Sequence, residues 1–119
     1  TAAHLRDFIR DVNRSNLGVN FDPANMLLYG NDKPIPAVEV LAPYLFNVHA
    51  KDGNWPTENG KLGAETPIGK GQVNFPKFIC KLKTVGYRGP LIIEREISGP
   101  QQIQDMRASI TFLKSLTKI

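Results

Sequence analysis

The sequence predicts an α/β fold in which parallel strands alternate with helices. Three short apolar runs have the length of buried strands, and helical segments precede, separate and follow them. The runs are residues 18–22, 45–49 and 90–94, and they end in Asp22, His49 and Glu94. The order, a helix and then three strand and helix units, requires right-handed parallel crossovers. Because the carboxyl ends of neighbouring parallel strands meet on one rim, we expect these three side chains to lie together.

Two helices are predicted around the first strand. The one before it has apolar side chains at the i, i+3, i+4, i+7 spacing, namely Leu5, Phe8, Ile9 and Val12. The one after it begins at Pro34 or Pro36, whose fixed φ suits a first turn, and ends at Pro43; its apolar stripe is Ile35, Val38 and Leu41.

The second half of the chain is predicted to hold a long loop and two further helices. Residues 51–74 contain glycines, prolines and Trp55 without sustained periodicity, and loops of this length are usually functional or disordered. A helix follows, with Asn74 as its N-cap, Pro76 in its first turn and its end near Gly86. The last helix starts at Pro100, and its apolar stripe is Ile103, Met106, Ile110, Leu113 and Thr117.

Composition indicates one domain, residues 1–119, and excludes several classes of protein. The net charge of +4 comes from scattered basic residues, so we expect no nucleic-acid partner. No apolar run approaches the roughly 20 residues needed to span a bilayer, and the first residues lack the apolar segment of a signal peptide. We therefore expect a cytoplasmic protein without a membrane partner. The single cysteine, Cys80, excludes an internal disulfide and is predicted to be a buried thiol on a helix.

The three residues that end the strands form a donor set suited to a divalent cation. Two carboxylates and an imidazole favour Mn²⁺, Mg²⁺, Co²⁺ or Zn²⁺ with open positions for substrate oxygens. Each residue also has an alternative role. Asp22 before Pro23 could start a turn, His49 could be a hydrogen-bonded core histidine, and Glu94 could belong to a surface salt-bridge cluster with Glu96 as its rival for the metal.

Four motifs in this order closely resemble one family. They are residues 18–26 (GVNFDPANM), 49–52 (HAKD), 67–75 (PIGKGQVNF) and 86–94 (GYRGPLIIE). Together they resemble the carboxyl-terminal half of the sugar phosphate isomerase/epimerase family, the xylose-isomerase-like TIM barrels. The resemblance covers nearly the whole chain and implies that it runs from the fifth helix of an eight-stranded barrel through the eighth.

The resemblance also implies an activity and a metal. In the family a divalent ion is held by Glu, Asp, His and Glu from the fifth to eighth strands. Asp22, His49 and Glu94 match the last three, while the first Glu would lie before Thr1. The implied function is a metal-dependent sugar or sugar-phosphate isomerase or epimerase. It would transfer a proton next to a carbonyl through an enediolate, with Glu94 as the catalytic acid or base.

Four more residues are assigned to substrate binding. Asn25 would meet a substrate hydroxyl by resemblance, with loop capping as the alternative. Lys51 is placed to meet an anionic group, or is simply solvated, and Asp52 completes the same tetrad. Trp55 would wall the sugar pocket or pin the loop. The loop of residues 69–71 would form a lid whose backbone amides meet an anion.

Two other classes of function remain open. A non-catalytic fragment or binding module could form a pseudo-barrel by dimerisation, because the edges and inward faces of the three strands have to be covered by a second copy or a complementing half-barrel. An abasic-site endonuclease fits poorly, because its zinc centre is rich in histidine and this chain offers only His4 and His49.

Overall fold

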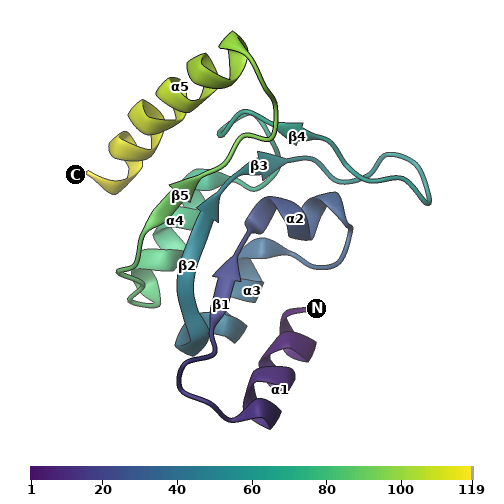
Figure 1. Cartoon of the computed structure of the whole chain (residues 1–119), viewed down its shortest axis with the longest axis vertical. Helices are drawn as coiled ribbons and strands as arrows, with labels where there is room; N and C mark the ends of the chain where they lie inside the picture. The colour runs from purple at the N-terminus through teal and green to yellow at the C-terminus, as the bar shows by residue number, and fades with distance from the viewer. Residues whose placement is uncertain (119) are drawn as a thin grey trace.

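A computed structural model describes residues 1–118 of the chain and shows the predicted alternation of helices and strands (Figure 1). The strands are short, and the helices range from one to five turns. In chain order the elements are α1 (Ala2–Val12), β1 (Val19–Phe21), α2 (Pro23–Leu28), α3 (Pro34–Leu41), a 3₁₀ turn (Ala42–Tyr44), β2 (Leu45–Ala50), β3 (Asp52–Gly53), β4 (Glu65–Thr66), α4 (Phe75–Thr84), β5 (Leu91–Ile93) and α5 (Pro100–Thr117).

A parallel three-stranded sheet in the order β1, β2, β5 forms the centre of the fold. Asn20 of β1 pairs with Asn47 of β2, and His49 of β2 pairs with Ile92 of β5. Strand order therefore follows chain order, as in consecutive strand and helix units of a barrel wall. The predicted α/β class with parallel strands is confirmed.

Helices α3 and α4 cover one face of this sheet, behind it in Figure 1. On that face Phe21 of β1 stacks on Phe78 of α4 with ring centroids 5.8 Å apart, and Phe75 meets Phe78 edge-on at 5.5 Å. All three rings are buried. Because side chains alternate along β1, the exposed Asn20 lies on the opposite face of the sheet.

The helix starts follow local chemistry. Asp22 caps α2 by accepting a hydrogen bond from the backbone N–H of Asn25, and Asn74 caps α4 from a positive φ of 63°. Proline occupies the first turn of both helices. The Asn74 cap matches the sequence prediction, whereas the short helix α2 was not predicted as an element of its own.

Three details of the sequence analysis need correction. The segment 51–74 is not wholly irregular, because β3 and β4 pair in an antiparallel ribbon. Cys80 is exposed and not buried. On α5 the buried line is Asp105, Ser109 and Leu113, whereas Ile103 and Ile110 of the predicted stripe are exposed.

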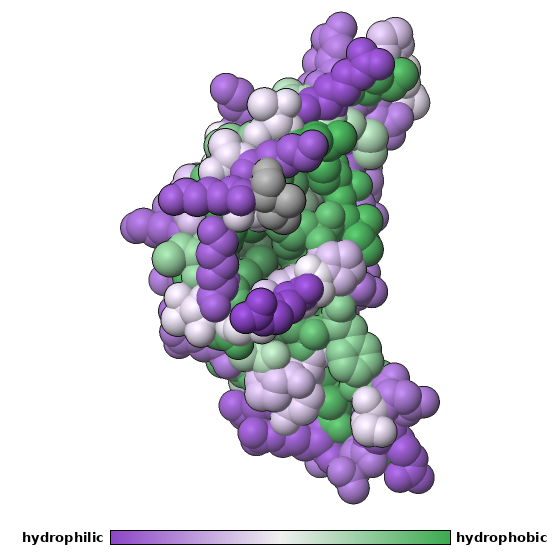
Figure 2. All heavy atoms as spheres, turned by 90° about the vertical axis from the view of Figure 1, so that its left-hand side faces the viewer, coloured by the Kyte–Doolittle hydropathy of each residue, from purple (hydrophilic) through white to green (hydrophobic). Residues whose placement is uncertain are grey.

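Ile110, one of the exposed apolar residues of α5, borders a groove. The groove lies between α5, α4 and the start of β5, and Leu82, Leu91, Ile110 and Leu113 are among its lining residues. Figure 2 shows this side of the molecule, where an apolar, hollowed surface lies beside hydrophilic residues. Within residues 1–118 no helix combines the length and apolarity needed to cross a bilayer.

Candidate metal centre

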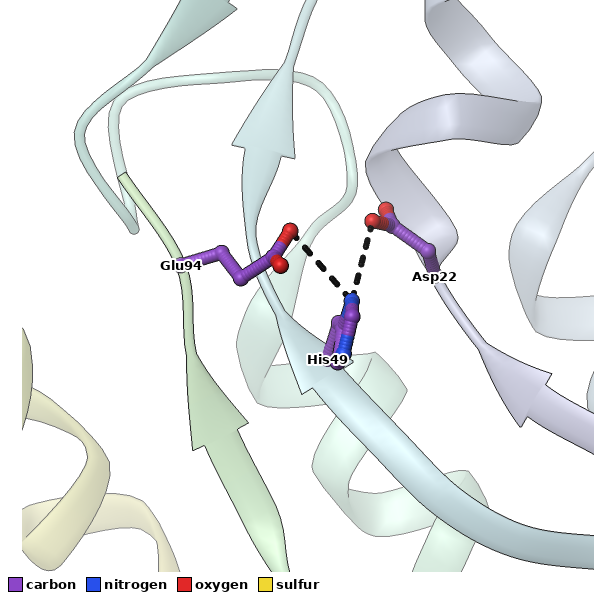
Figure 3. Close-up of side chains that lie close together, drawn as sticks. All are labelled: Asp22, His49 and Glu94. Carbon is purple, nitrogen blue, oxygen red and sulfur yellow. Dashed lines mark ion pairs between the residues drawn. The ribbon is translucent and has the colours of Figure 1, made fainter. Parts of the chain in front are cut away.

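Asp22, His49 and Glu94 converge at the carboxyl ends of the three parallel strands, as Figure 3 shows. The Nδ1 atom of His49 lies 3.3 Å from Glu94 Oε2 and 3.6 Å from Asp22 Oδ2. One donor atom from each residue falls within 4.8 Å of the others. The backbone fixes this geometry, because the N–H of Glu94 donates to the carbonyl of Ala50 and so continues the pairing of β5 with β2.

The two oxygens of Asp22 have different surroundings. Oδ1 accepts the capping hydrogen bond from Asn25 N at 2.9 Å. Oδ2 is buried and has no hydrogen-bond partner among the described residues. His49 Nδ1 at 3.6 Å and Lys51 Nζ at 3.7 Å lie beyond hydrogen-bond distance, so this oxygen can still accept a cation held with the help of His49 and Glu94. The residues present therefore fit a divalent ion.

His49 presents its two ring nitrogens to different partners. Nδ1 faces the two carboxylates, whereas Nε2 lies 3.0 Å from the side-chain amide nitrogen of Asn20. Asn20 was not singled out from the sequence. Its only signal there was its place two residues before Asp22 in the same strand, on the opposite face from the buried Val19 and Phe21.

Lys51 lies beneath the triad with its side chain only 2% exposed. Its Nζ donates to Glu96 and to Asn25 Oδ1, and it lies 3.7 Å from both Asp22 Oδ2 and Glu94 Oε2. Burial alone would lower the pKa of Lys51, but the hydrogen bond with Glu96 and the carboxylate charges outweigh it and raise the pKa. The solvated alternative is wrong: this lysine is an internal counter-charge for three carboxylates.

Asn25 and Glu96 are both partners of Lys51. Asn25 accepts from the ammonium while its backbone completes the α2 cap, so it borders the site without pointing freely into it. The side chain of Glu96 is largely exposed, and the hydrogen bond from Lys51 lowers the pKa of Glu96. The rival role of Glu96 as a metal ligand finds no support, because the triad joins Asp22 and His49 to Glu94.

Asp52 does not face the triad, and its assignment to substrate binding is corrected. The residue is 1% exposed. Its two oxygens accept hydrogen bonds from four backbone N–H groups of its own loop, those of Gly53, Gly69, Gly71 and Val73. The lid amides expected to meet a ligand anion are therefore already bound to this carboxylate.

Glycine is required where the loop wraps around Asp52. A Cβ on Gly71 would lie 2.3 Å from Asp52 Oδ1, and Gly69 has a φ of +88°. Trp55 is half-buried against the core, and its backbone N–H donates to Gln72. These contacts agree with the alternative in which Trp55 pins the loop, and the pocket-wall role stays a prediction.

A second charged cluster holds the chain just after Glu94. Arg95 pairs with Glu65 at 3.2 Å and with Asp105 at 2.8 Å, and the Glu65 carboxylate also accepts from the backbone N–H of Glu96. The cluster ties β4, the end of β5 and α5 together. Sequence reasoning missed it, because its members are far apart and no local pattern relates them.

This cluster predicts a loss of stability in acid. The hydrogen bonds from Arg95 and Gln101 lower the pKa of Asp105 below that of the unfolded chain. A group with a lowered folded pKa contributes stability above its unfolded pKa, near 4, and loses it as the pH falls through the folded value. We expect Asp105→Asn to be less stable than the parent by a constant amount above about pH 5 and by a shrinking amount below pH 4.

Urea unfolding of the parent and Asp105→Asn between pH 7 and pH 3 measures this difference. Asp11→Asn, at an exposed position of α1, is the matched control and should give a difference near zero throughout. A difference between the parent and Asp105→Asn that stays constant down to pH 3 would contradict the assignment.

Comparison with known proteins supports the fold and the family. Residues 1–116 match the family described as xylose isomerase-like TIM barrel. The uncharacterized protein MJ1311 of Methanocaldococcus jannaschii is 32% identical over 100% of this chain and 38% of its own length. The chain therefore spans well under half of this relative.

Two solved structures are similar over nearly the whole chain. A xylose isomerase domain protein from Planctomyces limnophilus is 44% identical with a TM-score of 0.95, over 98% of this chain and 43% of that one. A D-tagatose 3-epimerase-like protein is 28% identical with a TM-score of 0.75, over 99% of this chain and 41% of that one. With its parallel sheet and the extent of these matches, the chain belongs to the xylose isomerase-like TIM barrel family and forms part of such a barrel.

Proposed function

We propose that this chain carries the metal-binding rim of a sugar or sugar-phosphate isomerase or epimerase. The observation that carries the proposal is the buried Oδ2 of Asp22, which has no hydrogen-bond partner within residues 1–118 and faces His49 Nδ1 near the Glu94 carboxylate. Similarity to a D-tagatose 3-epimerase-like protein supports the reaction class. Asp22, His49 and Glu94 would hold Mn²⁺, Mg²⁺, Co²⁺ or Zn²⁺.

The chemistry assigned to the chain is proton transfer beside a sugar carbonyl. When bound, a divalent ion would polarise the carbonyl and hydroxyl oxygens of the sugar. Glu94 is one-third exposed, so its carboxylate can reach a bound molecule and remove or return the proton. Lys51 keeps a positive charge beside that carboxylate and holds Asn25 and Glu96 in place.

The surroundings of the site support a partner for this chain. Within residues 1–118 the outer strands β1 and β5 each pair on one side only, and Ile92 of β5 is exposed. Unpaired strand edges and exposed apolar side chains favour contact with another part of the protein or with another chain. A second copy or a complementing half-barrel would supply that contact.

Calorimetric titration of Mn²⁺ and Co²⁺ into the chain tests the metal site. We expect about one equivalent to bind and Asp22→Ala, His49→Ala and Glu94→Gln each to weaken binding at least about tenfold, since each removes a ligand. Glu58→Gln, an exposed carboxylate in the loop, is the control and should bind as the parent does. Circular dichroism checks that each variant is folded.

The outcomes separate cleanly. A folded parent that binds neither ion, or ligand variants that bind as well as Glu58→Gln, would contradict the site. Catalysis is tested on the metal-loaded chain by deuterium exchange from D₂O into D-fructose or D-tagatose next to the carbonyl. Exchange that Glu94→Gln abolishes at a metal concentration that saturates this variant supports the assigned role, and metal binding by the parent without exchange would contradict catalysis by this chain.

A further inference from the structure

Asn20 is the residue best placed to control how His49 binds a cation. It lies at the middle of β1, and its side-chain amide is 3.0 Å from Nε2, the ring nitrogen that points away from the carboxylates. Within residues 1–118 this amide is the hydrogen-bond partner that the structure gives to Nε2. We propose that Asn20 is a positioning residue that selects the tautomer of His49. The inference rests on the proposed metal function.

The geometry calls for a different tautomer with and without a cation. In the structure the amide nitrogen of Asn20 faces Nε2, so the amide donates and Nε2 accepts. The ring proton then lies on Nδ1, which faces Glu94 Oε2 at 3.3 Å and Asp22 Oδ2 at 3.6 Å. This arrangement gives Nε2 a donor and places the ring proton beside two carboxylates when no cation is present.

A cation held by the three residues would reverse these roles. Nδ1 must give its lone pair to the ion, because Nδ1 is the nitrogen that faces Asp22 and Glu94. The ring proton must then lie on Nε2 and needs an acceptor. Half a turn of the Asn20 amide brings its Oδ1 to Nε2 and supplies one.

An amide side chain suits both states because it carries a donor and an acceptor. A carboxylate at this position would support only the protonated Nε2, and an apolar side chain would support neither state. The strand backbone keeps the side chain in place, since Asn20 pairs with Asn47 on β2, directly after a shift in register, while its neighbours Val19 and Phe21 are buried on the other face.

The test uses nitrogen NMR of the two histidine rings, His4 and His49, in the chain labelled with ¹⁵N at pH 8, with and without Zn²⁺. His4→Gln assigns the His49 signals. For the parent we expect the proton on Nδ1 without zinc, and Nδ1 bound to zinc with the proton on Nε2 when zinc is added. Zinc affinity is measured in parallel by competition with a chelating dye.

Three variants decide the role of Asn20. Asn20→Leu is expected to bind zinc about 10 to 100 times more weakly, the usual effect of losing a partner that orients a metal-binding histidine. Asn20→Asp should keep affinity within about threefold of the parent and place the proton on Nε2 even without zinc. Asn47→Leu is the matched control on the neighbouring strand and should leave both affinity and ring signals unchanged.

The zinc affinities of the parent and of Asn20→Leu separate a failure of the role of Asn20 from a failure of the proposed metal function. A parent that binds no zinc overturns the metal function, while the proton position in zinc-free Asn20→Asp still tests the contact between Asn20 and Nε2. A parent that binds zinc, with Asn20→Leu binding equally well, overturns the role of Asn20 alone. Zinc bound through Nε2 would also overturn it.

Discussion

Replacing Asp52 with Ala is expected to lower the free energy of unfolding by about 3–5 kcal/mol, the range for removing a buried charged acceptor. The carboxylate accepts from four backbone N–H groups, and the bonds to Gly53 and Val73 are fully buried. Alanine would leave these donors without partners. Urea unfolding followed by circular dichroism measures the loss, and amide hydrogen exchange at Gly69 and Gly71 reports the loop directly.

Asp52→Asn gives the sharper test of the same contact. It keeps one acceptor oxygen but turns an amide N–H₂ toward two backbone donors, so we expect an intermediate loss of stability with faster exchange on one side of the loop. Asp11→Ala, at an exposed position, is the control. An Asp52→Ala protein as stable as this control would contradict the role of Asp52 as the centre of the loop.

Phe78→Ala is expected to cost about 3–5 kcal/mol, the usual range for a fully buried aromatic residue. Phe78 is 0% exposed and touches the rings of both Phe21 and Phe75, so alanine would leave a cavity between α4 and the sheet. Because domains are typically stable by only about 5–15 kcal/mol, such a loss is a large fraction of the free energy of unfolding. Thermal and urea unfolding measure it.

Phe8→Ala is the matched control for this prediction. Phe8 is 58% exposed on α1, so its truncation should change stability by no more than about 0.5 kcal/mol. Equal losses for Phe8→Ala and Phe78→Ala would mean that the core does not lie between α4 and the sheet. In that case the placement of the strand ends by this packing would also be in doubt.

The strands and the meeting of their ends could be predicted from the sequence. Residues 18–22, 45–49 and 90–94 are apolar runs of strand length, and parallel strands place their carboxyl ends together. This rule is enough to bring Asp22, His49 and Glu94 to one rim, where the structure has them. Their binding of a metal stays a prediction.

The partners of the charged residues could not be read in the same way. Asp52 follows His49 closely in sequence, but whether its carboxylate meets a ligand or its own backbone depends on where residues 69–73 return. Gly69 and Gly71 were the available signal, since glycines allow a backbone to wrap tightly around an anion. No comparable signal in the sequence indicates that Arg95 pairs with Glu65 and Asp105.

Periodicity also failed on α5 for a physical reason. It shows which residues share a helix face, but not whether other structure covers that face. Ile103 and Ile110 are exposed, while the buried line runs through Asp105, whose charge is paired with Arg95. A charged residue with a partner can therefore replace an apolar one at a buried position, which an apolar stripe cannot indicate.

His49 lies in β2, and Asp22 and Glu94 directly follow β1 and β5, so the site exists only where the sheet has already formed. In the unfolded chain long stretches of backbone separate them, and no two are held near each other. An ion that binds all three would act as a removable cross-link across the sheet. Its binding free energy would then add to the free energy of folding, so the cation concentration in solution would help to decide how much of the chain is folded.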